Sequence, residues 1–332
     1  GLSEHAAAGV CTTWSHAYSR QLRRCRYVDP RRVRQLADVP KHPRGLCMLP
    51  GGVLAITSTS LFEPSNHNNS AGVKFVAARN ESDPQALAAC QASSLAARRF
   101  EWLMGLALTN DGLLACSYDN VSAALYKFAK GGSMDELATV PVLAGPDLGF
   151  VRCAVHQQTQ RTYAIGQVED GNHALVILDA NLQVVAIVEA ICTFDEEEYD
   201  AEEYGPIRDV AVHGDQVIVL TSDSHDEGSG LRLLDLDGRF LHTITAGRFL
   251  NPWAVTASHG RAFVVDDDDG VPYVSLGKLL YVIDIQSGDI LQRVRVDLQG
   301  AIAGIRVDGN EIFIADCHDS KVAVLRYAGS EA

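Results

Sequence analysis

The chain has 332 residues and 47% of them are hydrophobic, so it is long enough to bury a sizeable core. No run of about eighteen apolar residues occurs, and the sequence therefore predicts no membrane-spanning segment. Acidic residues outnumber basic ones by 42 to 28, a formal charge of −14. This balance argues against nucleic acid as a partner, because Lys and Arg supply most of the affinity for phosphates.

The N-terminal arm, residues 1–30, has a helix-tolerant composition and is rich in arginine toward its end. Two interpretations stay open: a solvated surface helix, or an arm that docks on a partner. Residues 31–40, "RRVRQLADVP", read as a strand with no partner ahead of it in the chain. Residues 84–98, "PQALAACQASSLAAR", are compatible with a short helix or with an outer strand and loop.

The rest of the chain repeats one pattern: an apolar run, a tight turn, a second apolar run, an Asp-containing loop and a third apolar run. It is clearest at 207–236, 252–285 and 305–326, where Asp308-Gly309-Asn310 forms one of the predicted turns, and weaker from Arg44, Leu103 and Val151. The aligned starts lie near these six positions: Gly45, Gly105, Arg152, Asp209, Ala254 and Gly304. The spacing of roughly fifty residues predicts sheets of about four strands arranged as a repeat.

The ends of the chain complement each other. The last repeat stops after its third strand, 321–326, and we expect 31–40 to pair with that strand and to close a ring that covers residues 31–328. Closure would hide edges that otherwise pair with other chains.

One motif carries a family resemblance. The pattern Pro-x-x-Val-x-Val-x-x-Gly-x-x-Phe-Val-x-Asp is clearest at 205–223, 251–266 and 301–316, and it resembles the NHL-type repeat of six-bladed propellers. The resemblance implies an all-β, six-bladed β-propeller that uses one face to bind protein, RNA or a small ligand. It does not imply one activity.

Six-bladed lactonases, of the regucalcin and paraoxonase kind, suggest an alternative, a calcium-dependent hydrolase. Such a site needs several oxygen ligands facing the channel. The six aligned starts would form a ring around the channel, which we call the aligned ring. It supplies one carboxylate, Asp209, and one guanidinium, Arg152, and we expect these two groups to pair. A register shifted by one residue supplies Arg44, Met104, Val151, Arg208, Trp253 and Ala303. Neither register makes a calcium site, so we expect no catalytic residue, bound metal or cofactor.

The favoured hypothesis is a non-enzymatic module that binds a protein partner through one face. Exposed Arg and Trp are the usual anchors of interfaces. The candidates are Arg44, Trp102, Arg152, Arg208 and Trp253. For Trp102 and Trp253, ordinary core packing is the competing interpretation.

The cysteines bear on the compartment of the protein. Eight cysteines occur with no CxxC spacing, several within apolar strands, which favours an intracellular, reducing compartment; an even count leaves a disulfide framework open.

Asp223, Asp266 and Asp316 recur at the end of a second strand, and we expect them to cap backbone N–H groups. We expect the acidic run 195–203 to be a mobile loop outside the core.

Overall fold

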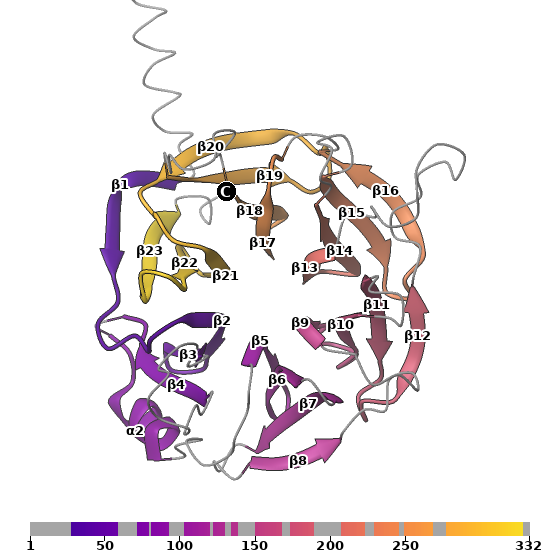
Figure 1. Cartoon of the computed structure of the whole chain (residues 1–332), viewed down its shortest axis with the longest axis horizontal. Coiled ribbons are helices and arrows are strands. Elements are labelled where there is room, and N and C mark those ends of the chain that lie inside the picture. The colour runs from indigo at the N-terminus through magenta and orange to yellow at the C-terminus, as the bar shows by residue number, and fades with distance from the viewer. Residues whose placement is uncertain are drawn as a thin grey trace, which may run out of the picture.

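The computed structural model describes residues 28–58, 72–79, 81–92, 103–119, 122–129, 134–138, 150–167, 173–188, 207–222, 229–245, 249–267 and 277–327. Strands dominate this part of the chain, and the sheets stand around a central axis like the blades of a propeller (Figure 1). No helix in these ranges is long and apolar enough to cross a membrane.

Five sheets have four strands each and one has three. The three-stranded sheet consists of β2 (Pro43–Leu49), β3 (Val53–Ser58) and β4 (Gly72–Ala77). The second sheet consists of β5 (Leu103–Thr109), β6 (Gly112–Asp119), β7 (Ser122–Ala129) and β8 (Met134–Ala138). The third consists of β9 (Phe150–Val155), β10 (Thr162–Gln167), β11 (His173–Leu178) and β12 (Val184–Val188).

The remaining sheets follow in the same antiparallel order. The fourth consists of β13 (Ile207–His213), β14 (Gln216–Thr221), β15 (Gly230–Asp235) and β16 (Phe240–Ile244). The fifth consists of β17 (Pro252–Ser258), β18 (Arg261–Asp267), β19 (Lys278–Asp284) and β20 (Ile290–Val296). The last combines β21 (Ile302–Asp308), β22 (Glu311–Asp316) and β23 (Lys321–Tyr327) with the N-terminal β1 (Val28–Gln35).

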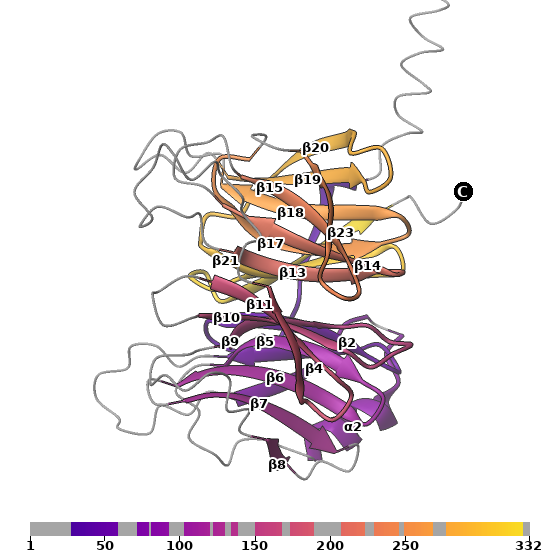
Figure 2. The same cartoon turned by 90° about the vertical axis from the view of Figure 1, so that its right-hand side faces the viewer.

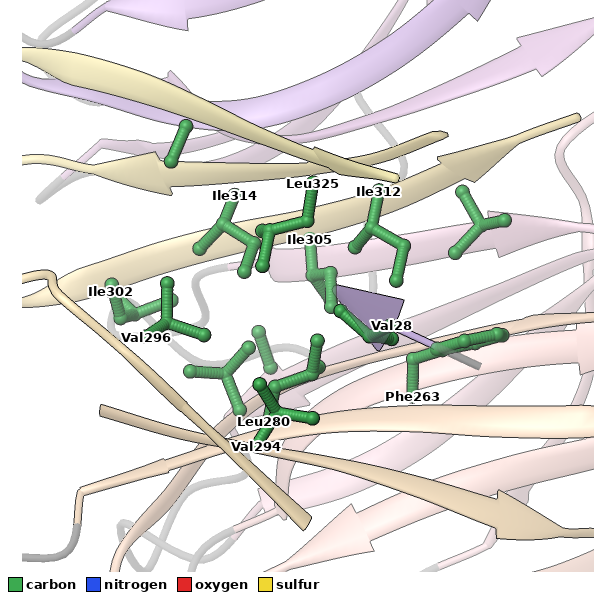
Figure 3. Close-up of a cluster of buried hydrophobic side chains, with 14 of the residues drawn as sticks. Val28, Phe263, Leu280, Val294, Val296, Ile302, Ile305, Ile312, Ile314 and Leu325 are labelled. Atoms are coloured by element: carbon green, nitrogen blue, oxygen red, sulfur yellow. The ribbon is translucent and has the colours of Figure 1, made fainter. Parts of the chain in front are cut away.

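Strand β1 runs antiparallel to β23 and pairs Val28 with Tyr327 and Val33 with Leu325. Val28 is fully buried in a cluster that joins the last two sheets, beside Phe263 and Ile305 (Figure 3). The strand covers 28–35, whereas the sequence pattern pointed to 31–40. It stops earlier because Asp38 has a φ of 55°, which turns the chain away before Pro40.

A polar clasp joins the first sheet to the last. Arg79, just after β4, donates from Nε to Glu311 at 2.7 Å and from Nη2 to the carboxylate of Asp308 at 2.6 Å. Arg34 on β1 reaches the other oxygen of Glu311 at 3.1 Å. The clasp and β1 together connect the two ends of the chain.

The three-stranded sheet has a helix, not a described fourth strand, on its outer side. Helix α2 (Pro84–Ala92) begins after Asp83, whose carboxylate accepts the N–H of Gln85 at 2.9 Å as an N-cap. Ala86, Leu87 and Cys90 pack against the cluster that contains Phe75 of β4. Of the two interpretations left open for 84–98, the helix is correct for the part that the structure describes.

The turns behave as the sequence indicated. Gly309 in the turn between β21 and β22 has a φ of 56°, a left-handed conformation that favours glycine. The inner two strands of the last three sheets are all joined by such short turns, at Gly214, Gly260 and Gly309.

The recurring aspartates are caps, as predicted, and reach further than a turn. Asp316 is fully buried; one carboxylate oxygen accepts the N–H of Asp319 and the other accepts that of Gly300, both at 3.0 Å. Asp266 accepts the N–H groups of Leu250 and Asn251 at 3.1 and 2.7 Å. Each carboxylate therefore fastens the segment that leads into the first strand of its own sheet. Asp223 lies outside the described residues.

Candidate protein-binding end of the ring

The first strand of each sheet lines the axis (Figure 1). Because these strands, β2, β5, β9, β13, β17 and β21, all run the same way along the axis, they begin at one end of the ring. We call this the entry end. The tight turns at Gly214, Gly260 and Gly309 lie at the opposite, turn end. Figure 2 shows the ring from the side.

Every inner strand carries a register irregularity close to its beginning. In β13 the partners of Ile207 and Asp209 are adjacent on β14, so Arg208 is an extra residue; Trp253 is extra in β17 in the same way. The residues at these bulges are Arg44, Met104, Val151, Arg208, Trp253 and Ala303. These are the six residues of the register shifted by one position in the sequence analysis, and each directly precedes its residue of the aligned ring. A β-bulge re-aims a side chain, and here it recurs at the entry end of every sheet.

The glycines of the aligned ring meet a packing requirement. A Cβ at Gly45 would lie 2.5 Å from the carbonyl oxygen of Met104, and one at Gly105 would lie 3.0 Å from Cα of Arg152. A Cβ at Gly304 would overlap the carbonyl oxygen of Arg44. Neighbouring inner strands thus touch backbone to backbone on this side of the axis, and only glycine leaves enough space.

A cavity of about 180 Å³ follows the axis between the inner strands. Its lining includes Arg152, Asp209 and Arg306. Arg152 extends from β9 to the last sheet, where Nη2 donates to the carbonyl oxygen of Ala303 at 2.6 Å. Its Nε lies 3.7 Å from Oδ1 of Asp209, which confirms the predicted ion pair. Arg152 therefore links three sheets across the channel.

Asp209 is committed to the backbone. Its Oδ1 accepts the N–H of Val210 at 2.9 Å and its Oδ2 accepts that of Val255, on the next inner strand, at 2.8 Å. Burial raises the pKa of this carboxyl to about 6, and Arg152 opposes that shift. Within the described residues no group of three His, Cys, Asp or Glu side chains is placed to hold a metal ion. Among the described residues that line the cavity, Asp209 is the one carboxylate, and both of its oxygens already accept backbone N–H groups.

The predicted site residues fall on the entry end as far as they are described. The guanidinium carbon of Arg208 lies 5.2 Å from the centre of the Trp253 ring, a cation–π contact between two neighbouring sheets. Trp253 is half-buried and also packs on the cluster between the last two sheets, in keeping with the core packing considered for it. Leu250, three residues earlier, is 43% exposed. Trp102 lies outside the described residues.

Arg44 lies close enough to Arg152 to be affected by its charge. Burial lowers the pKa of Arg44 and the charge of Arg152 lowers it further, while Cys317 partly opposes both effects. Arg208 acts in the same way on His173, whose pKa is lowered by burial first and by that arginine second. Sequence reasoning did not single out His173 or Cys317, because it placed only the first strand of each repeat at the axis and both residues lie outside those strands. The position of Cys317 directly after the recurring Asp316 was the one sequence signal.

Several other predictions fall outside the described residues. They concern residues 1–27 of the N-terminal arm, the acidic run 195–203 and the cysteines at 11, 25 and 192. The five described cysteines are Cys47, Cys90, Cys116, Cys153 and Cys317, and all are free thiols.

Comparison with known proteins identifies the fold. No protein-family model matches the chain, and a search of curated protein sequences found no match. A chain of Kuenenia stuttgartiensis hydrazine synthase is similar, with a TM-score of 0.57 and 16% identity over 88% of this chain and 78% of that one. A chain in the crystal structure of a nidogen/laminin complex gives a TM-score of 0.53 and 12% identity over 80% and 84%. The WD40 β-propeller domain of Doa1 gives a TM-score of 0.49 and 12% identity over 87% of this chain and 80% of that one. At these identities the first two likenesses show the fold alone.

Proposed function

We propose that this chain is a protein-interaction module whose partner docks on the entry end of the ring. The observation that carries the proposal is the Arg208–Trp253 stack, which two bulges place at the beginning of neighbouring inner strands. Arg and Trp are the residues most often found as interface anchors. The exposed Leu250 adds apolar surface beside them.

The architecture supports a scaffold. A rigid ring that presents loops and strand ends at one face is a common basis for binding sites, because the sheets fix the positions of the contact residues. We propose six NHL-type blades, with the β2–β4 sheet counted as a blade whose outer position is covered by α2. The nidogen/laminin structure, a complex of two proteins, supports the idea that a ring of this fold can take part in protein assembly.

The proposed compartment is intracellular and reducing. Four of the five described cysteines are buried free thiols, which fits strands in which cysteine acts as a small apolar residue.

Site-specific photo-crosslinking tests the docking end. A benzophenone amino acid replaces Leu250 at the entry end or Leu241 on the outer strand β16, which are 43% and 47% exposed and serve as a matched pair. In extracts of the source cells we expect a discrete crosslinked protein from position 250 and none from position 241. Adding Trp253→Ala to the first variant should abolish that product. Equal products from both positions, or a product indifferent to Trp253, would refute the proposed docking end.

A further inference from the structure

The cavity along the axis, here called the axial cavity, is lined by more positive than negative charge. The charged side chains among its described lining residues are Arg152, Asp209 and Arg306, which amounts to two guanidinium groups and one carboxylate. Arg152 and Asp209 form the ion pair across the channel, so each neutralises the other. One positive charge, that of Arg306 on β21, therefore remains in the wall of the cavity.

Among the described residues, none supplies an anion to the guanidinium of Arg306. Its Nε is buried and has no hydrogen-bond partner there. Asp209 is paired with Arg152, and both of its oxygens accept backbone N–H groups. Cys47 lies at the matching position of the neighbouring strand β2, and burial raises the pKa of its thiol to about 11, so it is uncharged near pH 7. A buried donor without an acceptor calls for an explanation, and a bound ion is one.

Small side chains make the space that Arg306 lines. Residues two apart on a strand face the same side, so the wall continues from the aligned ring to the residues two positions later. At that position β21 carries Arg306, its neighbour β17 carries Thr256, and β5, β9 and β13 carry Ala107, Ala154 and Ala211, all of which line the cavity. The wall thus combines a guanidinium and a hydroxyl from adjacent strands with methyl groups from three others.

The size and charge of the axial cavity define the class of ligand. Its volume of about 180 Å³ exceeds the share of one water, roughly 30 Å³, and is smaller than the roughly 300–1,000 Å³ of sites for drug-sized molecules. A monoanion balances one remaining positive charge, whereas a dianion would add uncompensated negative charge to the same cavity as Asp209. The planar fork of a guanidinium matches the two oxygens of a carboxylate. The alanine methyl groups suit a short hydrocarbon chain.

We propose that the axial cavity binds a short aliphatic monocarboxylate, with its carboxylate on Arg306 and Thr256 and its hydrocarbon end against the alanines. This binding site is separate from the Arg208–Trp253 stack, because neither of those two residues lines the cavity. It therefore does not depend on where a protein partner docks.

Ligand-observed NMR on the full chain tests the proposal. Saturation-transfer difference spectra are recorded with butyrate and with butyramide, its uncharged isostere, at about 150 mM salt. We expect butyrate to bind and butyramide not to bind, because only the anion offsets the charge of Arg306. Acetate should displace butyrate, and sulfate, a dianion, should not. Absence of butyrate binding, or equal binding of butyramide, would overturn the proposed ligand, and so would displacement by sulfate that matches displacement by acetate.

Substitutions in the wall locate the site. Arg306→Gln should weaken butyrate binding by about tenfold or more, because a hydrogen bond to a charged group is lost. Arg306→Lys keeps the charge but not the fork and should lie between the two. Thr256→Val keeps a similar shape, removes the hydroxyl and should weaken binding by about threefold to tenfold.

The control removes the same charge from the outside of the ring. Arg239, in the turn before β16, has a side chain that is 79% exposed, and Arg239→Gln should leave the affinity for butyrate unchanged. Equal weakening by Arg306→Gln and Arg239→Gln would show a general charge effect and overturn the site. Thermal melts report whether each variant is folded. If Arg306→Gln does not fold, Thr256→Val decides in its place, and unchanged butyrate binding by that variant would refute the assigned position.

Discussion

The buried aspartate at the end of β22 should be a principal fastener of the entry end. In Asp316→Asn the shape of the side chain is kept, but one acceptor oxygen becomes an NH₂ group. That group would face the backbone N–H of either Gly300 or Asp319, both of which now donate to the carboxylate at 3.0 Å. Asp316→Ala removes both acceptors. Neither N–H would gain a new protein partner from these changes.

The size of the effect follows from the number of bonds lost. A hydrogen bond to an ionised group contributes about 1.5–3 kcal/mol, so Asn should lower the free energy of unfolding by about 2–3 kcal/mol and Ala by about 3–6 kcal/mol. For 332 residues the entropy of unfolding is about 0.7 kcal/mol/K. The melting temperature should therefore fall by about 3–4 °C for Asn and about 4–9 °C for Ala.

Differential scanning calorimetry measures both variants directly. Asp297→Asn is the control, since Asp297 is exposed and accepts a bond from the Gln299 side chain at 3.1 Å; its effect should stay within about 0.5 kcal/mol. Asp266→Asn in the preceding sheet should resemble Asp316→Asn, because its carboxylate also accepts two backbone N–H groups. If Asp316→Asn melts like the wild-type protein, the capping account of these aspartates is wrong.

Three further outcomes are expected. Deleting residues 1–35 removes β1 and should lower the melting temperature of the whole ring cooperatively; a truncated chain that melts like the full one would contradict closure by this strand. Burial raises the pKa of the Asp209 carboxyl from 3.8 to about 6, so the folded state binds a proton at this group more tightly than the unfolded state does. The stability of the fold should therefore fall as the pH rises from about 4 to about 6. Asp209→Ala should remove this fall from a profile of melting temperature against pH. Gly304→Ala should destabilise the ring by about 3 kcal/mol or more in urea unfolding, since the new Cβ overlaps the backbone of Arg44. Gly214→Ala should cost only about 1 kcal/mol, because a Cβ there meets open space and only the φ of 53° is unfavourable.

The features predictable from sequence were those that depend on local pattern. Alternation in "EIFIAD" and "KVAVLR" identified β22 and β23, and alignment of the repeats brought Arg152 and Asp209 to one ring. The bulges were not predictable, because Arg208 and Trp253 stand at the starts of apolar runs like those of any other strand, and nothing in the local pattern marks an extra residue there. Residues 84–98 stayed ambiguous because alanine and leucine suit either structure. Packing of Leu87 against β4 decided for the helix.

The pairing of β1 with β23 also sets the order in which this protein can be completed in the cell. About 290 residues separate Gln35 from Lys321, so the first strand leaves the ribosome long before its partner is made. At about 5–20 residues per second this delay is roughly 15–60 s. Val28 and its apolar neighbours have no permanent site during that interval, and the last sheet cannot form until β23 has been synthesised. A chaperone that holds β1 would therefore have to act throughout this interval, and release when β23 emerges would convert an open array of sheets into a closed ring in one step.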